Sequence, residues 1–192
     1  QEPLRAKRVL EDAIGGAVHG YRAASYSITR RSLWALDTLV EAGFRYDSSI
    51  FPVHHDNYGI PNSPRHPYTI ETPNGGKLVE FPITTSKIAG VKVPVAGGGY
   101  FRLFPYWLTR TGLRRVNNVE RRPFVFYLHP WEVDPEQPRI EASLLSRFRH
   151  YNNLRKTEPR LKTLLSDFSF DRIDRVLDRV VLADEPLALS PA

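Results

Sequence analysis

A strand–helix–strand pattern near the start of the chain constrains the fold more than any other feature. Val18–Tyr21 and Phe44–Tyr46 are short segments that favour β-structure. Between them, Thr29 is a suitable N-cap for a helix that runs to about Ala42, and Gly43 is a suitable stop. Two strands joined through a helix by short links pair in parallel. The sequence therefore predicts an α/β fold with a parallel sheet.

The rest of the chain predicts further helices, one hairpin and one ordered loop. Helices are expected at 3–13, 105–116, 143–152, 158–166 and 170–177, with Thr157 and Ser169 as caps of the last two. Residues 68–71 and 77–81 flank Pro-Asn-Gly-Gly and predict a hairpin, whereas residues 51–67 predict a surface loop. The last residues, 185–192, predict a frayed tail.

Composition narrows the class of protein. The 192 residues are 41% hydrophobic, which suits one domain with a core, and the lack of Cys excludes disulfides and thiolate chemistry. No apolar segment approaches 18 residues, so no transmembrane segment is predicted. The formal net charge is +6, but the arginines are spread along the chain, so no nucleic-acid partner is predicted. The start at Gln1 and the absence of Met predict a segment of a longer protein.

The segment FVFYLHPWEVD, at 124–134, carries most of the functional information. Phe124–Leu128 predicts a short strand that is buried on both faces, and His129 follows where this strand ends. Pro130 fixes its own φ and pushes His129 toward an extended backbone beside Trp131. Ligands of α/β folds bind at the carboxyl ends of the strands. The sequence therefore predicts His129 in a functional site.

Two more polar residues, Arg22 and Asp47, also follow predicted strands. Strand ends in a barrel-like α/β fold converge on one mouth, where a carboxylate can hold the tautomer of an imidazole that serves as a general acid. Each residue also has a simpler interpretation: a satisfied histidine for His129, an Asx turn for Asp47 and a surface ion pair for Arg22. Together the three favour a site.

Three consecutive glycines, Gly97–Gly99, precede Tyr100. They allow a tight turn or a close approach of the backbone to a ligand. They lack the spacing and the lysine of a phosphate-binding loop, so no nucleotide site is predicted.

Three segments resemble the third, fourth and fifth motifs of NodB-type polysaccharide deacetylases, carbohydrate esterase family 4. They are GYRAASYSI at 20–28, YDSSIFP at 46–52 and FYLHPWEVDPEQPR at 126–139. HHDNYGIP, GGGYFRLFPYWL and HPWEVDPEQPR are similar to the subgroup linked to exopolysaccharide export and exosortase (PEP-CTERM) loci of Gram-negative bacteria. The resemblance covers about residues 3–180.

The resemblance implies a distorted (β/α) barrel that removes N-acetyl groups from a polysaccharide, of which this chain would be the C-terminal two-thirds. It implies a partial deacetylase domain over 1–140, in which 51–104 is an insertion with the hairpin and the Gly-rich loop, and a helical extension over 141–192. The implied location is cytoplasmic or at the cell envelope. No oligomeric state is implied.

The resemblance also implies roles for the three polar residues. Arg22 matches the residue that orients a catalytic base, Asp47 matches the carboxylate that supports the catalytic acid, and His129 matches the acid that protonates the leaving amine. The family's base and metal ligands come from two earlier motifs. A further departure is Ala24, which stands where the family usually has proline.

Substrate contacts are predicted for four more residues, the first of them from the resemblance. The backbone N–H near Ser25 would hold the developing oxyanion. Tyr26, Tyr100 and Trp131 would stack against sugar rings, although core packing is the alternative for each of these aromatic side chains.

The family uses a divalent metal, usually zinc, to polarise the acetyl carbonyl and activate water. This sequence has no Asp-Asp after an early strand and no His-x-x-x-His, so no residue is assigned as a metal ligand. His54 and His55 with Asp56 could replace the missing metal ligands, but the side chains of adjacent residues point apart. The resemblance places these residues in a loop that lines the sugar groove. The simplest explanation is that the metal motifs lie upstream. The alternative is a truncated, inactive carbohydrate-binding remnant.

Overall fold

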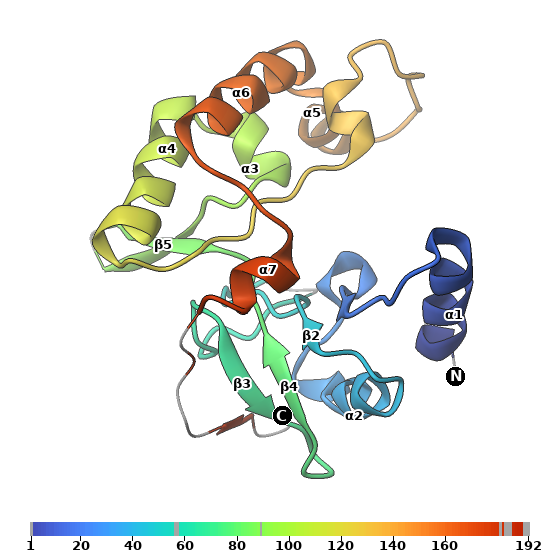
Figure 1. Ribbon diagram of the computed structural model, residues 1–192. Helices are drawn as coiled ribbons and strands as arrows, with labels where there is room; N and C mark the ends of the chain where they lie inside the picture. Colours follow the sequence, from blue (N-terminus) through green and yellow to red (C-terminus); the bar gives the residue numbers. More distant parts are fainter. Residues whose placement is uncertain (1, 56–57, 89, 181, 183–185, 190–192) are drawn as a thin grey trace. The chain divides into compact units, whose positions relative to one another are not determined.

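The structure is a computed structural model that describes residues 2–55, 58–88, 90–180, 182 and 186–189 (Figure 1). Its contacts divide the chain into two compact units, which are described separately. The first unit comprises 1–83 and 172–192, and the second comprises 84–171. The division at residue 140 that the resemblance implies stays a prediction.

The first unit contains a five-stranded sheet with helices. Its elements are α1 (Glu2–Ile14), β1 (Gly20–Tyr21), η1 (Ala24–Tyr26), η2 (Arg30–Ser32), α2 (Trp34–Glu41), β2 (Tyr46–Asp47), β3 (Tyr68–Glu71), β4 (Lys77–Glu80), α7 (Ile173–Leu177) and β7 (Leu187–Ala188). The strand order is β1-β2-β4-β3-β7, and β3 and β4 are the antiparallel pair of the predicted hairpin. The other three pairs are parallel, which confirms a mixed α/β fold with a mainly parallel sheet.

The end of the chain differs from the predicted frayed tail. Leu187 and Ala188 form a strand that pairs in parallel with Ile70 and Glu71 of β3. The free edge of β3 offers unpaired N–H and C=O groups, and a short segment that reaches it can satisfy some of them. Part of the predicted tail (185 and 190–192) lies outside the described residues.

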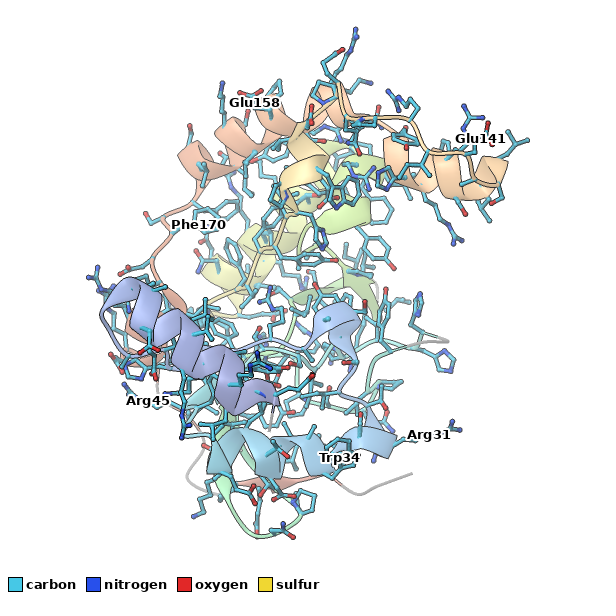
Figure 2. All side chains as sticks on the ribbon, turned by 90° about the vertical axis from the view of Figure 1, so that its right-hand side faces the viewer. Arg31, Trp34, Arg45, Glu141, Glu158 and Phe170 are labelled. Atoms are coloured by element: carbon cyan, nitrogen blue, oxygen red, sulfur yellow. The ribbon has the colours of Figure 1, made fainter. Side chains whose placement is uncertain are left out.

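The core of the first unit forms on α2, as the spacing of its leucines predicts. Leu33, Leu36 and Leu39 are almost completely buried, while Trp34 is 65% exposed at the start of the same helix (Figure 2). Gly43 has a φ of +76°, a conformation that glycine adopts freely, and ends the helix. The helix therefore presents one apolar stripe to the core.

The second unit consists of a hairpin and a group of helices. Its elements are β5 (Thr85–Ile88), β6 (Val91–Pro94), α3 (Gly98–Leu103), α4 (Tyr106–Arg114), η3 (Arg115–Val119), η4 (Pro130–Val133), α5 (Leu144–Tyr151) and α6 (Leu154–Asp167). One buried cluster joins Val95 and Leu113 to Leu164 and Phe168, so residues around the hairpin, α4 and α6 share a core.

Two predicted helix caps are wrong. Thr157 lies inside α6, where it is buried and its hydroxyl donates to the carbonyl of Asn153 at 3.2 Å. The helix begins earlier because Asn153 takes a left-handed conformation, φ 54°, and turns the chain out of α5. Similarly, α7 starts at Ile173 with Arg172 as its N-cap, so Ser169 does not cap it.

No helix formed by the described residues is both long enough and apolar enough to cross a membrane.

Candidate functional site

Arg22 and Asp47 lie at the carboxyl ends of neighbouring parallel strands in the first unit. The register pairs Tyr21 with Asp47, and Arg22 follows directly. The Arg22 side chain donates from Nε to the carbonyl of Ser48 at 3.0 Å and from Nη2 to the Ser48 hydroxyl at 2.9 Å. The structure therefore brings Arg22 to the turn that follows β2, on the segment that contains Asp47.

Asp47 is fully buried, and its carboxylate is held by the turn that follows it. The Ser49 hydroxyl donates to Oδ1 at 2.6 Å, and the Ser49 backbone N–H donates to Oδ2 at 3.3 Å. Ser49 in turn accepts a hydrogen bond from the backbone N–H of Ala23 at 2.8 Å. Asp47 thus closes an Asx turn, which is the simpler of its two interpretations. Its role in supporting the catalytic acid stays a prediction.

A second buried carboxyl, Glu80, lies beside Asp47. The two residues are register partners in the parallel strands β2 and β4, and both are 0% exposed. Glu80 accepts the backbone N–H of Ile50 at Oε1, at 3.0 Å, whereas no described N–H or O–H group donates to its Oε2. Burial, followed by the charge of Asp47, raises the pKa of Glu80 well above its ordinary value of 4.5. Glu80 therefore keeps its proton to a higher pH in the folded chain than an exposed glutamate does.

This proton gives the fold a dependence on pH. A carboxyl whose pKa is raised on folding binds a proton more tightly in the folded state, so the free energy of unfolding falls as the pH rises above 4.5. The fall continues until the pH passes the raised pKa. Because Gln cannot ionise and keeps both hydrogen-bonding groups, Glu80→Gln is expected to gain stability relative to the wild type, by up to about 1.4 kcal/mol per pH unit.

Urea unfolding at several values between about pH 5 and pH 8 measures this difference. Thr69→Gln, in the partner strand β3 and outside the carboxyl pair, controls for the new amide. A stability difference between Glu80→Gln and the wild type that is constant over this range would show that Glu80 does not hold a proton on folding.

The predicted substrate residues Ser25 and Tyr26 form the short turn η1, directly after Arg22 and Ala23. Both have left-handed backbones, with φ of 54° and 53°. Each such conformation costs on the order of 1–3 kcal/mol in a residue other than glycine, and such strain gathers at functional sites. Ser25 is exposed, and the Tyr26 ring meets the edges of Phe51 at 5.7 Å and Tyr58 at 5.8 Å. The oxyanion contact of Ser25 and the sugar contact of Tyr26 stay predictions.

His129 belongs to the second unit, where it ends an extended segment as predicted. Its φ and ψ are −99° and 146°, and the turn η4 begins at Pro130. The predicted strand over 124–128 is reduced to one isolated bridge between Tyr127 and Gly97. The segment does not form a longer ladder because the backbone N–H of Val125 donates to the Thr84 hydroxyl instead, at 2.8 Å.

The glycine run supports this segment. The backbone N–H of Tyr127 donates to the carbonyl of Ala96 at 2.8 Å, and the carbonyl of Tyr127 accepts the N–H of Gly98 at 3.1 Å. Gly97 has a φ of 115°, and a Cβ at this position would collide with the carbonyl oxygen of Tyr127. The close approach that the glycines allow is therefore made to the segment that carries His129.

The imidazole of His129 contacts a carboxylate that the sequence analysis did not assign. Glu132, three residues further on, accepts from the backbone N–H of His129 at 3.0 Å and lies 3.1 Å from its Nδ1. Glu132 also pairs with Arg102 of α3, whose Nε donates to its Oε1 at 2.8 Å. The side chain of His129 is 55% exposed, whereas those of Glu132 and Arg102 are 1% and 3% exposed. The carboxylate and its partner are buried while the imidazole reaches the surface.

Trp131 lies in ring contact with His129, as its position in the motif predicts. The centroids are 5.7 Å apart with an angle of 21° between the planes. His150 stacks more closely on Trp131, at 4.1 Å and 11°, and the guanidinium of Arg102 lies 4.9 Å from the indole. Trp131 is therefore part of a stack that holds the motif, as well as a candidate sugar contact. Tyr100 contacts Phe104, at 5.8 Å, and its role with substrate stays a prediction.

Within the part of the chain that the structure describes, no three His, Asp or Glu side chains come close enough to bind a metal ion. His55 stacks on the ring of Tyr58 at 3.8 Å, and Asp56 lies outside the described residues. The described residues do not fit the zinc that the resemblance implies.

Comparison with known families gives one match. Residues 48–178 match the family described as "Domain of unknown function (DUF3473)". Neither the curated proteins nor the solved structures gave a match. The matched region begins just after Asp47 and includes Glu80, Arg102, His129 and Glu132.

Proposed function

We propose that this chain, which belongs to the DUF3473 domain family, forms part of a hydrolase that removes N-acetyl groups from a polysaccharide during exopolysaccharide biosynthesis. The proposal rests on the motifs at 20–28, 46–52 and 126–139 together with one observation. His129 combines an exposed side chain with a ring nitrogen that lies against a buried carboxylate. This is the arrangement that a proton donor at a surface site requires.

The proposed reaction is the hydrolysis of an amide. Water adds to the acetyl carbonyl carbon, the C–N bond breaks, acetate leaves, and the amine nitrogen accepts a proton. His129 supplies this proton from Nε2, which has no hydrogen-bond partner among the described residues. The resemblance assigns the contact with the oxyanion to the backbone N–H near Ser25. According to the resemblance, Arg22 orients a catalytic base. No residue of this chain matches that base.

The divalent metal belongs to this proposal only through the family resemblance. Because the described residues do not fit a metal, we assign no ligand and no step of the reaction to it here. The residues of this chain account for the acid side of the reaction.

A non-catalytic carbohydrate-binding protein is the second candidate. Four rings gather in the first unit: Tyr26, Phe51 and Tyr58 meet one another at 5.7–6.0 Å, and His55 stacks on Tyr58 at 3.8 Å. His55 is exposed, so the cluster reaches the surface and could contact a sugar ring. This function would need no proton donor.

Acetate release distinguishes the two candidates. The full-length gene product is expected to release acetate from N-acetylglucosamine oligosaccharides in a reaction that chelators stop, whereas residues 1–192 alone are expected to release none and to bind zinc weakly. An enzyme-coupled acetate assay and zinc titration by calorimetry measure these results. Binding of the oligosaccharide without acetate release by the full-length protein would favour the second candidate. Strong chelator-sensitive release by residues 1–192 would show that the site assignment is wrong.

A further inference from the structure

Glu132 is a fully buried carboxylate of the second unit with both oxygens hydrogen-bonded. It lies in the turn η4, which Pro130 opens, and it is 0% exposed. Its Oε1 accepts from Nε of Arg102 at 2.8 Å, and its Oε2 accepts from the backbone N–H of His129 at 3.0 Å. Each carboxylate oxygen therefore accepts a hydrogen bond. Oε2 also lies 3.1 Å from Nδ1 of His129.

Arg102, the partner of Glu132, is itself held by several groups. Besides its bond to Glu132, it donates from Nη1 to the carbonyls of His150 at 2.8 Å and Asn152 at 3.2 Å. Its guanidinium also lies over the Trp131 ring. An arginine held by several acceptors and 3% exposed leaves Glu132 little freedom to move.

We propose that Glu132, held by Arg102, is the positioning residue that sets the tautomer and direction of His129. This inference rests on the proposed function, because it assigns the partner of the proposed proton donor. A carboxylate at Nδ1 accepts a hydrogen bond, so the neutral ring carries its proton on Nδ1. The protonated ring keeps that bond and presents its second N–H, at Nε2, to the leaving amine.

The family resemblance gives this supporting role to Asp47, and the two assignments make different predictions. Asp47 is occupied in its own unit by the hydroxyl and the backbone N–H of Ser49. Glu132 contacts His129 directly. If Glu132 is the partner, replacing it changes the state of the His129 ring, whereas replacing Asp47 does not.

Glu132→Gln is the discriminating substitution because it keeps the shape of the side chain. Its amide oxygen can still accept from Arg102, which leaves the amide NH₂ group facing His129. This group donates to Nδ1, so the neutral ring is expected to move its proton to Nε2, while the backbone N–H of His129 loses its acceptor. Long-range ¹H–¹⁵N spectra of ¹⁵N-histidine-labelled protein, recorded where the ring is neutral, distinguish the two tautomers. The His129 signals are assigned from their loss in His129→Ala.

The expected result is an Nδ1–H tautomer in the wild type and in Asp47→Asn, and an Nε2–H tautomer in Glu132→Gln. In the full-length gene product, Glu132→Gln is also expected to lower kcat by about 10²-fold or more while KM changes little. An Nε2–H tautomer in the wild type overturns the proposal without any variant. A tautomer that responds to Asp47→Asn and not to Glu132→Gln also overturns it.

The prediction for the tautomer and the prediction for the activity can each fail without the other. If the ring responds to Glu132→Gln as expected but the wild-type protein releases no acetate, the pairing of Glu132 with His129 stands and the proposed deacetylase function fails. If acetate is released and the ring does not respond, the function stands and Glu132 is not the positioning residue.

Discussion

His129→Ala in the full-length gene product is expected to lower kcat for acetate release by about 10²- to 10⁴-fold, which is the usual contribution of a general acid. KM is expected to change little, because the proposed role of His129 begins when the C–N bond breaks. Steady-state kinetics with an N-acetylglucosamine oligosaccharide measure both constants. Since the side chain is 55% exposed, its removal leaves no large cavity, and His129→Ala is expected to stay folded in the assay.

A second histidine provides the matched control. His19 is half-buried in the first unit and outside the proposed site, so His19→Ala is expected to keep the wild-type kcat. Unchanged turnover in His129→Ala would exclude His129 as the acid. Equal losses in both variants would point to a general effect on the fold.

The sequence was sufficient to predict local elements whose determinants are short. The leucines of α2, the Gly43 stop and the hairpin around Asn74-Gly75 all depend on residues within one or two turns of the chain, and the structure confirms each. The extended backbone of His129 followed from Pro130 alone. Predictions of this kind succeed because the deciding interaction is local.

Elements that depend on residues far apart in the sequence were not predicted correctly. The strand predicted over 124–128 is reduced to one bridge, because the backbone N–H of Val125 donates to the Thr84 hydroxyl, a contact that no periodicity reveals. The hairpin of β5 and β6 was not predicted, because TSKI and VKVP carry no strong alternation and Pro94 argues against a strand. The short strand β7 depends on the free edge of β3, which exists only once the sheet has formed.

Two carboxylates near the predicted site residues, Glu132 and Glu80, were not predicted from the sequence. Glu132 could have been found, because an acidic residue three positions after His129 across a proline turn matches the spacing of a capping box. Glu80 gave no such signal. It looks like the polar end of a hairpin strand, and only the parallel register of β2 with β4 places it against Asp47.

The ion pair beneath His129 leads to the largest expected effect on stability. Arg102→Met keeps the length of the side chain and removes its charge, so the carboxylate of Glu132, which is 1% exposed, loses its partner. The carbonyls of His150 and Asn152 lose a donor at the same time. Removing one partner of a buried ion pair costs about 3–5 kcal/mol, and the free energy of unfolding is expected to fall by this amount. Urea unfolding followed by circular dichroism measures it.

A double variant tests whether the cost comes from the stranded charge. In Arg102→Met with Glu132→Gln neither charge of this ion pair remains, so part of the lost stability is expected to return, although each substitution alone removes a hydrogen bond. Lys162→Met is the matched control, because its partner Glu158 lies exposed on α6 and this pair should contribute far less (Figure 2). If Arg102→Met were no more destabilising than Lys162→Met, the pair would not be buried in solution, and Glu132 would lack the rigidity needed to hold His129.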